Sequence, residues 1–284
     1  EQIVLDASVD FEAFYDQRRG ARRELEDATL VAAIDGKGIP MVKAEPAEVA
    51  VRLCKGQKRH KKRMSTVAAV FSHQPRPRTP EEVVQSLFAP PQPAARSRPR
   101  RERSRPQDKR VWASLLADKT TFITGVRDEL QHRDPDHELP WVIVTDGERA
   151  LQKRVCALFA DVPLVLDLFH VLEKLWRAAH ALPPEGSPEA QSFVRDRTLR
   201  ILRGQGGQVV KGLRQMVTKR KLRGTKRKAL SSAAGYLRRN RSRMQYDVYL
   251  AKGWPIASGS VEGACKNLVK DRMERSGMRW TPPM

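Results

Sequence analysis

Cysteines, long apolar runs and a signal segment are scarce or absent in this sequence. The three cysteines, Cys54, Cys156 and Cys265, are far apart and show no CxxC spacing, so neither a zinc site nor a disulfide framework is indicated. No apolar run reaches the roughly 18 residues of a membrane-spanning helix. No basic-then-apolar segment with a small-residue cleavage site is found near residue 1. These absences argue against a disulfide-bonded secreted domain and a membrane protein, and they predict a cytoplasmic protein.

Acidic residues are also scarce relative to basic ones. Lys and Arg number 54 and Asp and Glu 33, which gives the 284-residue chain a formal net charge of +21. This excess favours a polyanionic partner, with nucleic acid first and a membrane surface as the weaker alternative. The hydrophobic fraction of 40% is enough for a buried core in one large domain or two small ones.

Short apolar runs predict three strands in the first part of the chain. Residues 30–34 form a β-prone run closed by Asp35 and Gly36, residues 39–42 form a second run, and residues 64–72 form a third. The first two runs predict a hairpin with Asp35 at its rim. All three together predict an antiparallel meander.

The next segment, residues 73–110, is rich in Pro and Arg. Residues 96–110 hold eight basic residues against two acids, so we expect a flexible basic excursion that follows a short helix at residues 80–88. Contact with DNA and a solvated linker are equally open interpretations of this excursion. An amphipathic helix is then expected from Trp112 to about His132.

Strand and helix patterns alternate in the middle of the chain. Two apolar strand patterns, at residues 141–145 and 163–166, are each followed by an amphipathic helix pattern. This alternation implies parallel strands covered by helices. Coming after a three-stranded meander, it predicts an α/β protein with an RNase H-like mixed sheet flanked by helices.

Three acidic residues occupy positions that an RNase H-like sheet would bring close together. Asp35 follows the first strand, Asp146 follows the fourth, and Glu262 lies near the start of a late helix. The first and fourth strands of an RNase H-like sheet are neighbours, so the three carboxylates would converge into a site that suits Mg²⁺ or Mn²⁺. Each acid alone has an ordinary interpretation, because Asp-Gly is a common turn signal and the helix dipole favours a first-turn Glu.

The segment 253–280 predicts an amphipathic helix around Glu262. Ser258 or Ser260 can serve as its N-cap. Lys266 and Lys270 follow Glu262 at i+4 and i+8, either as salt-bridge partners or as phosphate contacts. The apolar residues that recur at helical spacing are Val261, Ala264, Cys265, Leu268 and Val269.

The segment before this helix, residues 183–250, is strongly basic. Its part from residue 211 to residue 243 holds thirteen Lys or Arg and no acid, with intermittent helical spacing of apolar residues. An acid-free stretch of this length predicts salt-dependent contacts with DNA phosphates. A solvated basic helical pair is the alternative. The candidate DNA contacts are Arg238, Arg239, Arg241 and Arg243.

Four sequence blocks carry a resemblance to a known family. They read AAIDGKGIPM, VIVTDGERALQ, LDLFHVLEKLW and GSVEGACKNLVKDRMERSGMRW. Together they resemble DDE-type bacterial insertion-sequence transposases of the ISKra group, which are similar to the wider Mutator-like transposases. The resemblance spans about residues 29 to 280, and the last block is its most specific part.

The resemblance implies an RNase H-like catalytic domain over residues 28–284. This domain would be interrupted by the excursion at 73–110 and by an all-α basic insertion at 183–250, with residues 1–27 as the tail of an upstream region. Family members usually carry an N-terminal DNA-binding region, which we expect to be missing or truncated here. The implied catalytic and metal-binding triad is Asp35, Asp146 and Glu262, and a Cys-or-Asp, two residues, His motif is matched by Asp167 and His170.

The implied reaction uses two divalent ions, Mg²⁺ or Mn²⁺, about 4 Å apart. We expect Asp35 to bridge both ions, with Asp146 on one and Glu262 on the other. Water attack would free a 3′-OH at a transposon end, and that hydroxyl would then attack target DNA in the same site. The expected partners are double-stranded DNA, as transposon ends and target, and further copies of the chain in a homo-oligomer on the bacterial nucleoid.

Other residues are candidates around this site. His170 would order water or the scissile strand, or it would be a buried structural histidine hydrogen-bonded near Asp167. Trp254 would stack on an unpaired base, or it would be a core residue. A non-catalytic DNA-binding protein and an RNase H-like nuclease or resolvase without strand transfer are the rival interpretations. The phosphate contacts expected beside Glu262 are Lys266, Asn267 and Lys270.

Overall fold

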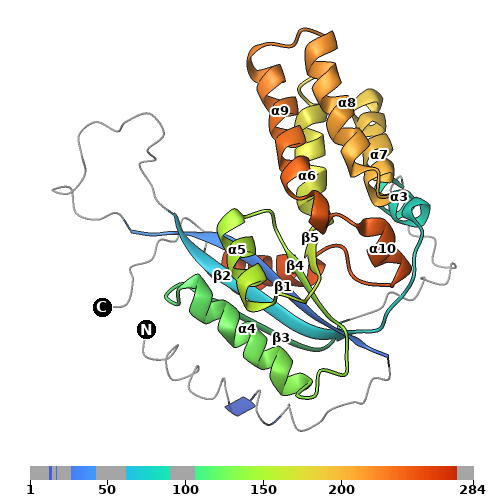
Figure 1. Cartoon of the computed structure of the whole chain (residues 1–284). Coiled ribbons are helices and arrows are strands. Elements are labelled where there is room, and N and C mark those ends of the chain that lie inside the picture. The colour runs from blue at the N-terminus through green and yellow to red at the C-terminus, as the bar shows by residue number, and fades with distance from the viewer. Residues whose placement is uncertain (1–12, 15–16, 18–26, 43–61, 90–105, 274–284) are drawn as a thin grey trace, which may run out of the picture.

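A five-stranded mixed sheet forms the centre of the protein (Figure 1). The computed structural model describes residues 13–14, 17, 27–42, 62–89 and 106–273. Its strands are β1 (Thr29–Pro40), β2 (Lys62–His73), β3 (Gln107–Ser114), β4 (Trp141–Thr145) and β5 (Leu164–Leu166). The order is β3-β2-β1-β4-β5, in which β1, β2 and β3 pair antiparallel and β4 and β5 run parallel to β1. This α/β arrangement is compatible with an RNase H-like fold and confirms the predicted fold class.

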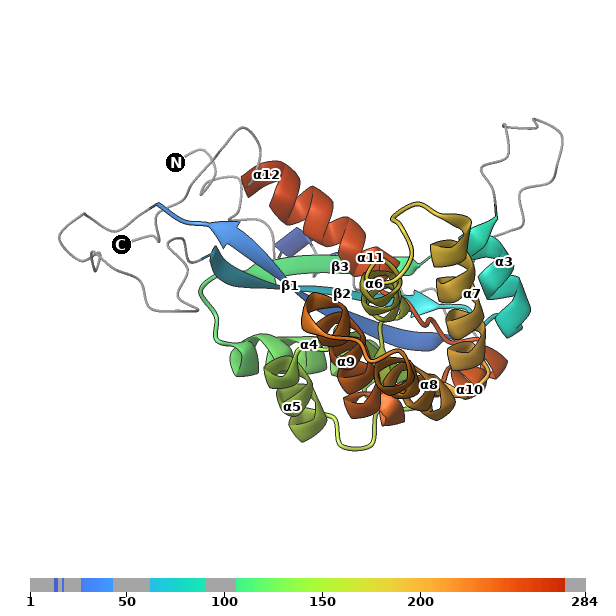
Figure 2. The ribbon, with the colours of Figure 1, turned by 90° about the horizontal axis from the view of Figure 1, so that it is seen from above.

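The two faces of the sheet bury different sets of β1 residues, because side chains alternate along a strand. Leu30 and Ile34 pack with α4 (Lys119–Arg133) and α5 (Arg149–Leu158). Val31 and Ala33 belong to the core on the other face, together with residues of α6 (Leu168–Ala179) and of the last helix. Figure 2 shows α4 and α5 on one side of the sheet and the last helix on the opposite side.

The expected hairpin at Asp35 was wrong. β1 is one strand of 12 residues, and its pairing with β2 continues from Asp35↔Val67 to Pro40↔Lys62. The Asp-Gly dipeptide is ambiguous because Gly also fits an extended strand wherever a neighbouring side chain lies close. A Cβ on Gly36 would lie 3.2 Å from the Met64 side chain. The third expected strand is therefore β2, the second strand of the meander.

The helix expected from Trp112 was wrong in its first part. Trp112 lies in β3, the true third strand of the meander, and α4 begins only at Lys119. The Asp118 carboxylate caps α4 by accepting the N–H groups of Thr120 and Thr121 at 2.8 and 3.2 Å. Trp112 nevertheless packs against Phe122 of α4, with 6.0 Å between the ring centroids.

The expected flexible excursion at residues 73–110 is ordered at both ends. Helix α3 (Pro80–Phe88) matches the predicted short helix, and a capping box between Thr79 and Glu82 begins it. The final residues of the segment belong to β3. Residues 90–105, which hold most of the arginine-rich part, lie outside the described residues, as do most of residues 1–27.

The alternating strands and helices in the middle of the chain were predicted correctly. β4, α5, β5 and α6 follow one another, and the parallel registers pair Ile34 with Thr145 and Thr145 with Leu166. Asp167 is the N-cap of α6, and its carboxylate accepts the N–H of Phe169 at 2.7 Å. The end of β4 and the start of α6 therefore lie next to Asp35.

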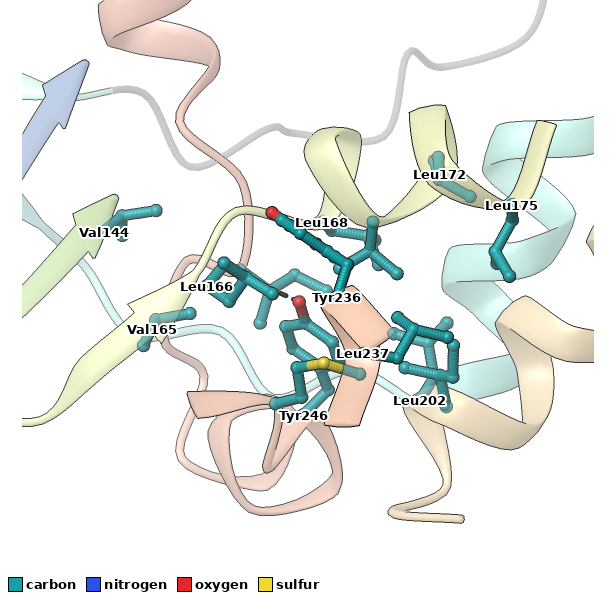
Figure 3. Packing of buried hydrophobic residues seen from close by; sticks show 14 of the residues in the cluster. Val144, Val165, Leu166, Leu168, Leu172, Leu175, Leu202, Tyr236, Leu237 and Tyr246 are labelled. Atoms are coloured by element: carbon teal, nitrogen blue, oxygen red, sulfur yellow. Dashed lines mark hydrogen bonds between the residues drawn. The ribbon is translucent and has the colours of Figure 1, made fainter. Parts of the chain in front are cut away.

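The segment 183–250 is helical, as predicted, and we call it the helical insertion. Figure 1 shows its long helices beside α6, at one end of the sheet. In Figure 3 the Tyr246 hydroxyl donates to the Leu166 carbonyl at 2.7 Å, which joins the insertion to β5. Its elements are α7 (Pro188–Leu202), α8 (Gly206–Lys219), α9 (Gly224–Arg239), the 3₁₀ turn η2 (Arg241–Arg243) and α10 (Tyr246–Ala251).

The last helix combines α11 (Gly259–Ala264), the π-helical stretch η3 (Cys265–Lys270) and α12 (Asp271–Met273). Val261, Cys265 and Val269 are buried against the sheet, as the apolar stripe predicted. Ser258 occupies the N-cap position without capping the helix, because its hydroxyl donates to Asp167 instead. The π-helical turns depart from the 3.6-residue period, so Lys270 does not repeat the position of Glu262 as an α-helix would place it. Residues 274–280 of the expected helix lie outside the described residues.

The described helices were compared with the length and apolar character that a membrane-spanning helix requires. None of them is both long enough and apolar enough to span a bilayer.

Candidate acidic site and basic surface

Asp35 and Asp146 lie on the same face of the sheet. Asp35 has the strand parity of Val31 and Ala33, which pack against the last helix. Asp146 follows β4 with the parity of Val142 and Val144, which share that core. The parallel pairing of β1 with β4 runs to Ile34↔Thr145, so each acid comes one residue after this pair.

His170 joins the two acids. A carboxylate oxygen of Asp35, a carboxylate oxygen of Asp146 and a ring nitrogen of His170 all lie within 4.8 Å of one another. All three residues are half-buried. We call these three residues the acidic cluster. The first two are the expected acids, and the third residue was expected only as an auxiliary group.

The carboxylate of Asp35 is held at both oxygens. Its Oδ1 accepts the backbone N–H of Gly36 at 2.7 Å, and its Oδ2 accepts the thiol of Cys265 at 3.6 Å. Burial, followed by the charge of Asp35, raises the pKa of the Cys265 thiol to about 12, so the thiol stays protonated and remains a donor. Cys265 was not expected at the site, although its spacing of three residues from Glu262 places it on a neighbouring part of the same helix surface.

The carboxylate of Asp146 is less easily ionised than a solvent-exposed aspartate. Its Oδ1 accepts the N–H of Glu148 at 2.9 Å. Burial is the largest cause that raises the pKa of Asp146, and the negative charge of Asp35 raises it further. Bringing two carboxylates together in a half-buried place is unfavourable unless a cation lies near them.

His170 supplies positive charge to this place. Its Nδ1 lies 3.9 Å from Asp167 Oδ2 and makes no hydrogen bond with any residue of the described chain. The Asp167 carboxylate is the main cause that raises the pKa of His170 to about 9, and Asp35 and Asp146 add to it. At neutral pH the imidazole is therefore protonated and offsets part of the negative charge.

Asp167 is fully buried and joins three parts of the fold. Its Oδ1 accepts the N–H of Phe169, and its Oδ2 accepts both the N–H of Ser258 at 3.0 Å and the Ser258 hydroxyl. The connection between β5 and α6 is thereby fastened to the turn that begins α11. Asp167 lies outside the acidic cluster; its hydrogen bonds fasten the start of the last helix, and its charge acts on His170 from 3.9 Å.

Glu262 is near the acidic cluster but lies outside it. It is half-buried, and burial followed by the charge of Asp167 raises its pKa, with a further contribution from Asp35. Cys265, three residues later on the same helix, touches Asp35. Glu262 therefore lies on the same helix as a residue that touches Asp35, and the charge of Asp35 reaches it.

The thirteen basic residues of the segment 211–243 lie on α8, α9, η2 and the turn between α8 and α9. All are exposed except Arg243, which is half-buried and donates to Cys156 Sγ at 3.7 Å. Between α8 and η2 lies a groove of about 560 Å³, which we call the basic groove. Its basic lining residues are Lys211, Arg214, Lys219, Arg238 and Arg241.

The other expected contact residues lie in two different places. Lys266, Asn267 and Lys270 are exposed on η3, next to the helix that carries Glu262. Trp254 is buried and stacked on Tyr249, with 6.0 Å between the ring centroids. It lines hollows beside the first residues of β4 and β5, whereas the acidic cluster lies at the ends of these strands. This position agrees with the alternative of a core tryptophan.

Comparison with known proteins gives no further assignment. No protein-family model matches the chain, and no curated protein matches it in sequence.

Proposed function

We propose that this protein is a DNA transposase of the DDE type, which cleaves transposon ends and joins them to target DNA with a divalent cation. The observation that carries the proposal is the acidic cluster, because Asp35 and Asp146 come from distant parts of the sequence and meet on one face of an RNase H-like sheet. The helix that carries Glu262 packs on the same face. The meeting of Asp35 and Asp146 supports two of the three acids that the resemblance implies, and Glu262, near the cluster but outside it, is proposed as the third.

The donor set of the acidic cluster fits a hard divalent cation. Carboxylate oxygens are preferred ligands of Mg²⁺ and Mn²⁺, and two half-buried like charges are relieved by a cation between them. Asp35 and Asp146, with Glu262 as the proposed third acid, would hold Mg²⁺ or Mn²⁺, as one ion or two. When bound, such ions activate water and stabilise the leaving oxygen of a phosphate.

The neighbouring residues of the chain would prepare this site. Gly36 and Cys265 fix both oxygens of Asp35. The charge of His170, protonated at neutral pH, opposes the rise in the pKa of Asp146, and the imidazolium would face the non-bridging oxygens of a bound phosphate. Its Nδ1 lies 3.9 Å from Asp167 Oδ2.

DNA is the partner that the charge distribution supports. The basic groove presents exposed Lys and Arg on the helical insertion, and η3 presents exposed Lys266 and Lys270 on the last helix. Each phosphate contact would add about 0.9 to the slope of log K against log salt. Assembly as a homo-oligomer on DNA, and a place on the bacterial nucleoid, are parts of the same proposal.

Incubation with labelled duplex DNA and Mg²⁺ tests the proposal. The wild-type protein should nick a duplex that carries the transposon end and then join that end to a target duplex. Asp35→Asn, Asp146→Asn and Glu262→Gln should each abolish both steps while DNA binding survives. Nicking without joining would favour the nuclease or resolvase, and binding without nicking would favour the non-catalytic DNA-binding protein. Retained cleavage in any one variant would remove that residue from the triad.

A further inference from the structure

A buried glutamine joins the loop between β4 and α5, residues 146–148, to the helical insertion. We call these three residues the Asp146 loop. Gln152 of α5 donates through Nε2 to the backbone carbonyl of Asp146 at 3.0 Å and to Oδ1 of Asn240 at 3.1 Å. A primary amide has two N–H groups, so both bonds can form at once. Gln152 is 5% exposed and Asn240, the C-cap of α9, is 3% exposed. The Asp146 loop and the basic helix α9 are thus connected through one side chain.

A second contact between the same two parts is steric. Asn240 donates through Nδ2 to the Tyr236 carbonyl at 3.0 Å, one turn earlier in α9. The ring of Tyr236 packs on Gly147 so closely that a Cβ there would lie 2.3 Å from Tyr236 Cε2. Figure 3 shows the hydroxyl end of Tyr236 directed toward the connection that precedes Leu168. The residue after Asp146 is therefore held by α9 as well.

These contacts act on the peptide groups that orient the Asp146 carboxylate. Its Oδ1 accepts the N–H of Glu148, so the carboxylate direction depends on the peptide planes between residues 146 and 148. Gln152 fixes the first of these planes through the carbonyl, and Tyr236 limits the space around Gly147. Ligands of a metal site must be held within about 0.5 Å of their working positions, so such support controls affinity.

We propose that Gln152 and Asn240 are positioning residues for Asp146, so that the basic helical insertion is also a structural support of the acidic cluster. The proposal rests on the proposed function, in that the cluster must bind a divalent cation. It assigns to the insertion a role beyond phosphate contact. It also accounts for a buried glutamine and asparagine at the junction of α5 and α9, where apolar residues would fill the space without hydrogen bonds.

Titration of the full chain with Mn²⁺, followed by calorimetry at neutral pH, tests this proposal. Gln152→Met keeps the buried volume and removes both hydrogen bonds, and Asn240→Ala removes the partner on α9. Each should weaken Mn²⁺ binding by about 10- to 100-fold, the usual effect of losing an outer partner of a metal ligand. The double variant should be no weaker than the worse single variant, because both act through one connection.

Matched measurements separate positioning from loss of folding. Gln131→Met makes the same exchange on α4, where Gln131 donates to Pro135 at the surface, and it should leave Mn²⁺ affinity unchanged. Binding to a random-sequence duplex at fixed salt should stay within about twofold in every variant, because the basic residues remain. Amide hydrogen exchange of residues 146–149 should become faster in Gln152→Met and Asn240→Ala.

The outcomes distinguish this proposal from the proposed function. Wild-type protein that binds no Mn²⁺ would contradict the metal site and this inference together. Tight binding by the wild type, with unchanged affinity in both Gln152→Met and Asn240→Ala, would overturn the positioning role alone. An equal loss of Mn²⁺ and duplex binding in the variants would indicate general destabilisation and would also overturn it.

Discussion

The acidic cluster and the basic groove use charge in opposite ways. The cluster brings Asp35 together with Asp146 and His170, which both come more than one hundred positions later, and half-buries all three. The pKa values of Asp146 and His170 are raised there. The groove takes its charge from exposed basic residues of α8, α9 and η2, which follow one another along the chain. Folding creates the first site, whereas local composition creates the second. A single substitution should therefore have a large effect on cation binding in the cluster and a small effect on DNA binding in the groove.

The largest effect is expected from removing one acid of the cluster. Asp35→Asn or Asp146→Asn should weaken Mn²⁺ binding by more than about 100-fold, because even the loss of an outer partner of a ligand costs 10- to 100-fold. Calorimetric titration measures this effect. Asp161→Asn, which neutralises an exposed acid before β5, should bind Mn²⁺ like the wild type. Equal affinities in all of these proteins would show that the cluster holds no cation.

A pH effect on stability is expected from His170. Its pKa is raised in the folded protein from 6.5 to about 9, so the stabilisation is complete below pH 6.5 and is lost as the pH rises toward 9. The expected loss is about 2 kcal/mol, after allowance for the exposed part of the ring. Urea unfolding with EDTA at both ends of this range measures it.

Two histidine variants show where this pH effect originates. His170→Asn should remove the loss of stability between pH 6.5 and pH 9. His137→Asn, which changes an exposed histidine far from the cluster, should keep the pH profile of the wild type. A His170→Asn profile like that of the wild type would assign the effect to another group.

The contact of Gly147 with the Tyr236 ring, which joins the Asp146 loop to α9, predicts a change in the stability of the folded protein when Gly147 is replaced. Gly147→Ala places a Cβ against the Tyr236 ring and should destabilise the protein by about 1–3 kcal/mol, as overpacking does. Gly125→Ala, in the open middle of α4, should instead stabilise it by about 0.5–1 kcal/mol. Thermal unfolding compares the two variants. A neutral Gly147→Ala would mean that α9 does not press on the Asp146 loop.

The smallest effect per residue is expected in the basic groove. Arg238→Ala with Arg241→Ala should lower the slope of log K against log salt by up to about 1.8, from about 0.9 for each lost phosphate contact. Lys109→Ala with Arg127→Ala removes the same charge from exposed positions on β3 and α4 and should change the slope less. The full set, with Arg239→Ala and Arg243→Ala added, should flatten it further. Duplex binding at four salt concentrations measures the slope, and an unchanged slope in the full set would exclude these arginines from the DNA contact.

Much of the sheet could be predicted from the sequence. The apolar patterns of β4 and β5 predicted their positions, and the order of meander and α/β half predicted that β1 and β4 are neighbours. With the alternation of side chains, this was enough to expect Asp35 and Asp146 on one face. The helix at residues 80–88 was also predicted at its observed bounds.

The errors came where one local pattern fits two structures. Asp35-Gly36 is typical of a turn, yet β2 pairs with β1 on both sides of it and holds the backbone extended. Trp112 fitted a helical stripe, yet it lies on an edge strand and packs on the helix that follows.

The detailed contacts of the cluster depend on side-chain rotamers and on tertiary packing. His170 rather than Glu262 completes the group of three, the thiol of Cys265 reaches Asp35, and Gln152 reaches Asn240. These residues are far apart in the sequence, so their contacts could not be predicted from residue spacing.

A crystal structure of the protein soaked in Mn²⁺ tests the central claim most directly. We predict an anomalous difference peak between the carboxylates of Asp35 and Asp146, with the carboxylate of Glu262 turned toward it. Absence of a peak at the acidic cluster under saturating Mn²⁺, with the fold intact, would contradict the account.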